Sequence, residues 1–164
     1  MSELYLGCDN GLSGGLCVIS GSLIIAKTVM LVKKSRKGRE VDVVAAWNWI
    51  EDTVQFHNLD KLHAVVEEPG GAKSYKAAVS MAASFHALRA MFEINHVKFT
   101  RITPQKWQKP LLKAKAGDTK PAALKLAQKL WPDESWLRTP RCIVPDHNLV
   151  DAALIAYYGL QNLY

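Results

Sequence analysis

Acidic and imidazole side chains stand where apolar segments of this sequence end. Asp9 ends an apolar run in "YLGCDNGLSGG", and Glu67 and Glu68 end another in "AVVEEPGG". His147 and Asp151 are four residues apart, so in a helix they share one face, one turn apart. Residues of these types are the ones that bind metal ions or transfer protons.

A carboxylate at the end of a buried strand costs several kcal/mol unless a cation or a metal compensates it. The alternative for Asp9 is a plain hairpin turn, because Asp and Asn both favour turns. Mg²⁺ and Mn²⁺ prefer carboxylate oxygens and water, and a histidine suits Mn²⁺. Two such ions about 4 Å apart can activate a water and stabilise the leaving oxygen in phosphodiester cleavage. We therefore hypothesise an oxygen-rich cluster with one imidazole.

Several of these residues also have structural explanations. Asp146 follows Pro145 and suits the N-cap of the last helix. His147 can be an ordinary surface or hydrogen-bonded histidine, and Glu68 can be solvated beside the turn. No Cys/His set has zinc spacing, and the glycines of "NGLSGG" fit neither common nucleotide-binding loop.

The composition is that of a folded, basic protein. The chain has 164 residues, 49% hydrophobic and 22% charged, and a net charge of +6, which predicts a single domain over residues 1–164. Basic residues concentrate in "KKSRKGR" and in "RITPQKWQKPLLKAK", which favours a polyanionic partner over two solvated loops. No apolar run approaches the ~20 residues of a membrane span, and "MSELYLG" lacks signal-peptide features, so we expect a cytoplasmic protein.

The hydrophobic pattern predicts an α/β fold. The predicted strands cover 4–9, 15–20, 23–31, 62–68 and 96–102, and the predicted helices cover 41–56, 74–94, the segment from 118 to 131 and the segment after 146. Short links make the first three strands an antiparallel meander, and the later alternation of strand and helix predicts two parallel strands. The result is a five-stranded mixed sheet flanked by helices. The ends of parallel strands meet at one edge, where α/β sheets bind ligands.

In order along nearly the whole chain, these motifs resemble the RuvC-type Holliday junction resolvases, in particular their phage-like branch, within the ribonuclease H-like nuclease superfamily. "LGCDNGLSGGLCVI" is similar to the first strand with its aspartate and the hairpin after it, and "AVVEEPGG" to the fourth strand with its glutamate. "ITPQKWQK" is similar to the segment after the fifth strand. "DTKPAALKLAQKLWP" and "DHNLVDAALIAYYGL" are similar to the two closing helices.

The resemblance implies a set of metal ligands: Asp9, Glu67 and Asp151. Glu67 is preferred to Glu68 because it directly follows the apolar strand, where the family glutamate stands. Many relatives carry an acid or histidine three residues before the last aspartate, and here that position is Asn148. We therefore predict His147 as the fourth catalytic and metal-binding residue, with Asp146 as the fallback.

The function implied is an Mg²⁺- or Mn²⁺-dependent endonuclease, with two ions per site, that resolves four-way or branched DNA in recombination and repair. The resemblance also implies a homodimer, located in the host cytoplasm if the gene belongs to a phage. The alternatives are a related nuclease for another substrate, such as an RNA–DNA hybrid, and a non-catalytic nucleic-acid-binding protein of the same fold. The predicted DNA contacts are Lys33, Lys34, Arg36, Lys37, Arg39, Lys73, Tyr75, Lys106, Lys109, Lys113 and Lys115.

Overall fold

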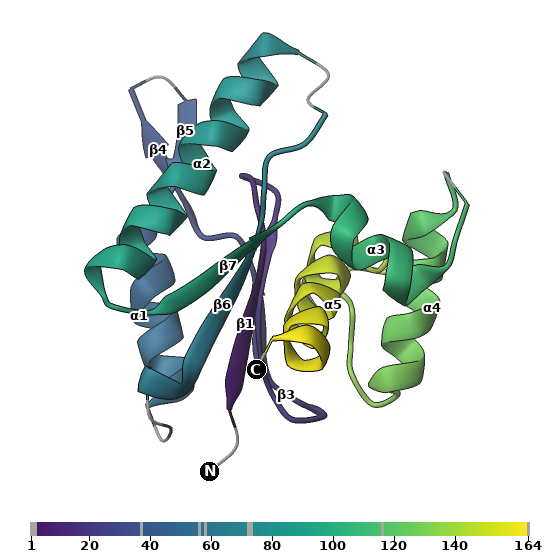
Figure 1. Cartoon of the computed structure of the whole chain (residues 1–164). Helices are drawn as coiled ribbons and strands as arrows, with labels where there is room; N and C mark the ends of the chain where they lie inside the picture. Colours follow the sequence, from purple (N-terminus) through teal and green to yellow (C-terminus); the bar gives the residue numbers. More distant parts are fainter. Residues whose placement is uncertain are drawn as a thin grey trace.

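The main sheet has five strands in a mixed arrangement, as predicted. The computed structural model describes residues 3–36, 38–55, 57, 59–71, 74–115 and 117–163. The strands are β1 (Leu4–Asp9), β2 (Gly15–Ser20), β3 (Leu23–Val29), β6 (Leu62–Glu67) and β7 (Lys98–Ile102). They lie in the order β3-β2-β1-β6-β7 (Figure 1). The first three strands are antiparallel, whereas β6 runs parallel to β1 and to β7.

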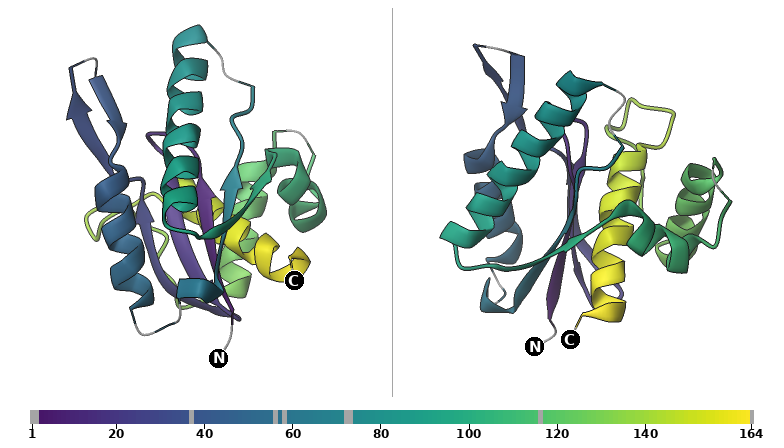
Figure 2. Two further views of the ribbon diagram at one scale, coloured as in Figure 1. Left: turned by 60° about the vertical axis from the view of Figure 1, so that its left-hand side comes forward. Right: turned by 45° about the horizontal axis from the view of Figure 1, so that its top comes forward.

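Helices cover both faces of the sheet. They are α1 (Val43–Val54), α2 (Tyr75–Ile94), α3 (Pro104–Leu112), α4 (Thr119–Leu130) and α5 (His147–Asn162), with a 3-10 turn at Leu59–Lys61. In Figures 1 and 2, α1 and α2 lie on one side of the sheet, whereas α5 lies on the other with α3 and α4 outside it. Within the described residues, no helix combines the length and apolarity needed to span a bilayer.

Strand alternation divides the core between these two faces. Leu4, Leu6 and Cys8 of β1 pack in a cluster with residues of α1 and α2. Tyr5 of the same strand packs in the second cluster, with α5 and the buried Trp107 of α3. Successive strand side chains point to opposite faces, so one strand serves both clusters.

Two elements differ from the prediction. The basic segment expected as a loop forms a small antiparallel hairpin, β4 (Val32–Ser35) with β5 (Gly38–Val41). The segment around Trp107 was also expected as a loop, but it is α3, which begins with Pro104 in its first turn. Neither segment carries a clear apolar period, which is the signal on which the prediction relied.

Helix α5 lies unusually close to β1 because β1 carries a glycine at the contact. A Cβ atom on Gly7 would lie 2.0 Å from the carbonyl oxygen of Ala152 and 2.5 Å from the amide nitrogen of Ala156. A Cβ on Gly15 would likewise lie 2.7 Å from the carbonyl oxygen of Asn148. These are backbone atoms, so only movement of the whole helix would make room. The first half of α5 is thereby held against the ends of β1 and β2 that carry Asp9 and Gly15.

We predict that Gly7→Ala lowers the free energy of unfolding by about 3 kcal/mol or more, because it forces α5 away from the sheet. Urea unfolding of the purified variant measures this loss. The matched control is Gly70→Ala, whose added Cβ would meet nothing closer than 3.6 Å. Similar losses for both variants would contradict the close-packing explanation.

Candidate active site

The parallel pairing of β1 with β6 places Asp9 beside Glu67. The register pairs Cys8 with Val66, and the next residue on each strand is the acid. Neighbouring strands lie about 4.8 Å apart, so the two carboxylates share one small region at the edge of the sheet. This confirms the sequence-based expectation that these strand ends meet.

Helix α5 packs on the face of the sheet to which Tyr5, Gly7 and Asp9 belong, and it adds Asp151. Its first turn is fixed by Asp146, the N-cap, whose Oδ1 accepts hydrogen bonds from the Asn148 backbone N–H at 2.9 Å and from the Asn148 side-chain amide at 2.8 Å. The close packing of α5 on Gly7 then holds Asp151 near the acids at the strand ends. The prediction of Asp146 as a helix cap is confirmed.

The three acids perturb one another. Burial raises the pKa of Asp9 well above its ordinary value, and the charges of Glu67, Asp151 and Asp146 raise it further. Burial and the charge of Glu67 raise the pKa of Asp151 from 3.8 to about 7. Burial also raises the pKa of Glu67. A group of half-buried carboxylates that resist ionisation is typical of a functional site.

Two residues that the sequence did not reveal lie against this cluster. Trp107 is fully buried, and its indole Nε1–H donates a hydrogen bond to Glu67 Oε2 at 2.6 Å. This hydrogen bond offsets part of the rise in the pKa of Glu67 that burial causes. Lys120, in the first turn of α4, lowers the pKa of both Asp9 and Asp151 by its charge. No sequence signal marks either contact, because each joins residues that only the tertiary fold brings together.

The other two candidate ligands, Glu68 and His147, have different surroundings. Glu68 lies outside the cluster, with its Oε1 3.6 Å from Arg101 Nε and its backbone N–H bonded to the carbonyl of Ile102. The Nδ1 atom of His147 is buried and has no hydrogen-bond partner among the described residues. Its role as a fourth ligand stays a prediction.

The chemistry of the donor set fits a hard divalent cation, since three carboxylates meet at one edge and repel one another in the absence of a counter-charge. The side chains are nevertheless not arranged as a complete metal site. Within the described part of the chain, no three His, Cys, Asp or Glu side chains converge closely enough to hold an ion. Metal binding is therefore a proposal, and Asp9, Glu67 and Asp151 are the residues to which it applies.

The predicted DNA-contacting side chains are exposed where the structure describes them. Those on or beside the β4–β5 hairpin are Lys33, Lys34, Arg36 and Arg39, those on or after α3 are Lys106, Lys109, Lys113 and Lys115, and Tyr75 begins α2. Tyr75 is 86% exposed. Lys37 and Lys73 lie outside the described residues. The hairpin and α3 stand on opposite sides of the sheet (Figures 1 and 2).

A groove of about 740 Å³ runs between the hairpin and α2. Lys33, Arg39 and Lys76 contribute positive charge to its lining, although Lys33 is also 3.7 Å from Glu40. Leu12, in the turn that follows Asp9, lines the same groove. None of the three clustered acids lines this groove, so it is a basic surface feature on the α2 side of the sheet.

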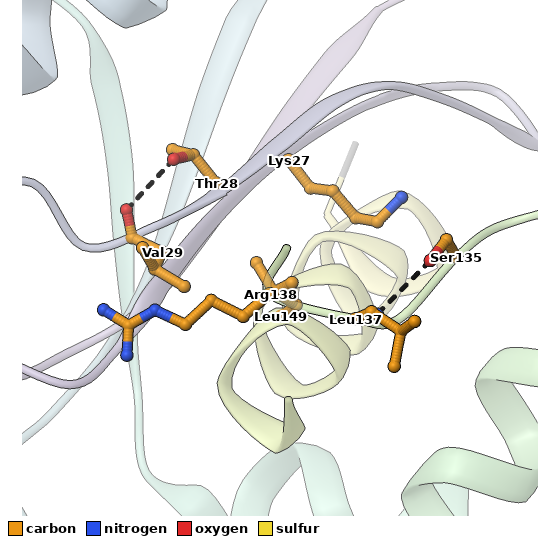
Figure 3. Close-up of a pocket in the computed structure, with 7 residues that line it drawn as sticks. All are labelled: Lys27, Thr28, Val29, Ser135, Leu137, Arg138 and Leu149. Atoms are coloured by element: carbon orange, nitrogen blue, oxygen red, sulfur yellow. Dashed lines mark hydrogen bonds between the residues drawn. The ribbon is translucent and has the colours of Figure 1, made fainter. Parts of the chain in front are cut away.

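A smaller cavity of about 280 Å³ lies between β3 and the segment that precedes α5 (Figure 3). Lys27 and Arg138 both line it, but Figure 3 shows their charged ends pointing in different directions. Lys27 forms an ion pair with Glu134 and lies over the ring of Trp136. None of the clustered acids lines this cavity, so we assign it a packing role.

We predict that Asp151→Asn stabilises the protein in EDTA at pH 8. The raised pKa means that the folded chain holds a proton which the unfolded chain releases between about pH 4 and pH 7, so ionisation costs stability above that range. The free energy of unfolding should rise by on the order of 2 kcal/mol at pH 8 and by much less at pH 4.5. Urea unfolding at both pH values checks this, with the exposed Asp52→Asn as control. A gain that is equal at both pH values would contradict the cluster.

Comparison with known proteins extends these observations. No protein-family model and no curated protein matches the sequence. The fold matches T. thermophilus RuvC in complex with a Holliday junction substrate, with a TM-score of 0.64, 17% identity, and coverage of 96% of this chain and 93% of that chain. It also matches a Thermus thermophilus RuvC structure with a TM-score of 0.58, 15% identity, and coverage of 96% and 95%. This chain therefore has the ribonuclease H-like fold of RuvC, as its motifs implied.

Proposed function

We propose that this protein is a divalent-metal-dependent endonuclease that resolves Holliday junctions and related branched DNA. The observation that carries the proposal is the meeting of Asp9, Glu67 and Asp151 at one edge of a sheet whose fold matches RuvC. One of those RuvC structures is a complex with a Holliday junction substrate. A protein that only bound DNA would gain nothing from clustered acids that face phosphates.

In this proposal the three acids bind Mg²⁺ or Mn²⁺, two ions in the complete site, and His147 completes the cluster or positions the water. Bound divalent cations supply activation of a water molecule and neutralisation of the charge that develops on the phosphate. The chain itself orients the carboxylates, through the close packing of α5 and the indole of Trp107. Lys120 adds a positive charge beside Asp9 and Asp151.

The exposed basic side chains hold the DNA. Residues of the hairpin and of α3 contact phosphates, which fixes the position of the DNA and makes binding sensitive to salt. Tyr75 is exposed at the start of α2 and offers a ring on which an unpaired base at the crossover can stack. The groove between the hairpin and α2 adds Lys33, Arg39 and Lys76 as a basic surface on which a DNA strand can lie.

We predict metal-dependent, paired nicks in a labelled synthetic four-way junction, and none in EDTA. Asp9→Asn should lower the cleavage rate by ~10²–10³-fold or more, because it removes charge from the centre of the cluster. Glu68→Gln is the matched control, an acid at the same strand end that lies outside the cluster, and it should cleave within about threefold of wild type.

A matched linear duplex and an RNA–DNA hybrid run beside the junction, each with Mg²⁺ and with Mn²⁺. Preferred cleavage of the hybrid would support a nuclease but contradict the proposal that its substrate is a four-way junction. Tight binding of the junction with no cleavage under either metal would leave a DNA-binding protein. Equal losses of cleavage rate in Asp9→Asn and Glu68→Gln would contradict the proposal that the acidic cluster is the catalytic site.

The protein acts as a homodimer in this proposal, because paired cleavage of a four-way junction needs two active sites. One side of α2 carries four apolar residues that suit either a dimer interface or core packing, and three of them are buried in the core: Met81 is the exception, whereas Phe85, Leu88 and Phe92 are buried. A better interface is an apolar hollow of about 360 Å³ between α1 and α2, lined by residues that include Trp47 and Met91. Val44 and Ile94 are 64% and 75% exposed there.

We predict a dimer in sedimentation equilibrium, and a monomer for Ile94→Lys, because a lysine there places a charge in the buried centre of the interface. Ile143→Lys is the matched control: Ile143 is 93% exposed in the loop before α5, away from this hollow. If Ile94→Lys is still a dimer, the interface does not lie at this hollow. If the wild-type protein is a monomer, the homodimer proposal is wrong.

A further inference from the structure

The contact between Trp107 and Glu67 joins the core to the acidic cluster. Trp107 lies in α3, which follows β7 directly, and β7 pairs with β6 so that Ile102 is opposite Glu67. The indole is therefore carried to the end of β6 by a short connection. Its Nε1–H donates a hydrogen bond to Glu67 Oε2 at 2.6 Å, which is a short N–H···O distance.

Core packing holds the indole ring of Trp107 in place, whereas the flexible carboxylate of Glu67 has no such packing of its own. Trp107 has no exposed surface and packs in the same cluster as Ile102, Ala123 and Ala127. Glu67 has a long, flexible side chain, and its charge acts on Asp9 and Asp151. An indole N–H can only donate, and here it donates to Oε2 of this carboxylate. One oxygen is thereby occupied by the core, and the other is left for the cluster.

The indole N–H groups of two other buried tryptophans, Trp131 and Trp136, do not reach the acidic cluster. Trp131 is also buried, and its Nε1 donates to the backbone carbonyl of Ser22 at 2.8 Å, away from the acids. The Nε1 of the buried Trp136 has no hydrogen-bond partner among the described residues. An indole N–H that reaches a half-buried carboxylate of the cluster is thus a specific arrangement.

We propose that Trp107 is a positioning residue for metal binding: its indole N–H fixes Oε2 of Glu67 and thereby orients the other oxygen of that carboxylate toward the divalent cation. The inference rests on the proposed function only in requiring that the cluster binds such a cation. It assigns Trp107 no contact with DNA or with the reacting atoms. Groups that orient a metal ligand in this way typically change metal affinity by ~10–100-fold when they are removed.

The test is the affinity for Mn²⁺ alone, measured without DNA from the electron paramagnetic resonance signal of the free ion. Trp107→Phe keeps most of the ring and removes the N–H, and we expect its Mn²⁺ affinity to fall by ~10–100-fold. Trp131→Phe is the matched control, a buried tryptophan that loses an indole hydrogen bond outside the cluster, and it should bind Mn²⁺ within about threefold of wild type.

A Trp107→Phe protein that binds Mn²⁺ as tightly as wild type overturns the inference and leaves the proposed nuclease intact. Equal weakening in Trp107→Phe and Trp131→Phe also overturns it, because general loosening of the core would then explain both. A wild-type protein that binds no Mn²⁺ overturns the metal site itself, and the inference with it.

A second measurement needs no folded Trp107→Phe protein. In wild-type protein labelled with ¹⁵N-tryptophan, the indole resonance of Trp107, assigned through its contacts to Ile102 and Ala123, should shift when Mg²⁺ is added. The resonance of Trp131 should stay in place. A Trp107 resonance that does not respond to saturating Mg²⁺ overturns the inference.

Discussion

Mutual repulsion among half-buried carboxylates is the constraint on which this structure depends. Asp9, Glu67 and Asp151 come from two strand ends and a helix, and each lies where burial already disfavours its charge. Such a group destabilises the folded chain at neutral pH unless a counter-charge is supplied. Lys120 and the indole of Trp107 each supply part of the compensation. The residual repulsion is what a divalent cation would relieve, which links the cost in stability to the proposed chemistry.

Close backbone packing keeps these acids together in spite of that repulsion. Gly7 and Gly15 allow α5 to approach the sheet so closely that no other side chain fits at either position. The Asp146 cap fixes the first turn of the same helix. Movement of α5 away from β1 would therefore cost buried contacts. The acids stay close together, and their repulsion raises the pKa values of Asp9 and Asp151.

Much of this arrangement could be predicted from the sequence because it depends on local patterns. The ends of β1 and β6 follow from apolar runs that stop at an acid, and the Asp146 cap follows from residue preference at a helix start. The same reasoning left Glu67 and Glu68 open, because two adjacent acids at a strand end differ only in the face on which they lie. The structure separates them: Glu67 faces the cluster, whereas Glu68 lies beside Arg101.

The contacts that could not be predicted join distant parts of the chain. Trp107 and Glu67 are 40 residues apart and meet only because β6 and β7 are parallel neighbours. The β4–β5 hairpin was expected as a loop because its sequence is a run of basic residues without apolar alternation. Its strand pairs include the like charges of Lys34 and Arg39, but also the apolar pair of Val32 with Val41 and the opposite charges of Lys33 and Glu40.

Opposite charges lie on different elements of this fold. The hairpin and α3 carry positive charge on exposed side chains, on opposite sides of the sheet, whereas the half-buried acids lie at its edge. A phosphate backbone is attracted by the first set and repelled by the second. In the proposed nuclease, the basic side chains would therefore bind DNA without a divalent cation, whereas a phosphate would approach the acids only after a cation had neutralised their charge. Binding and cleavage would then be separable steps, because opposite charges would carry them on different elements.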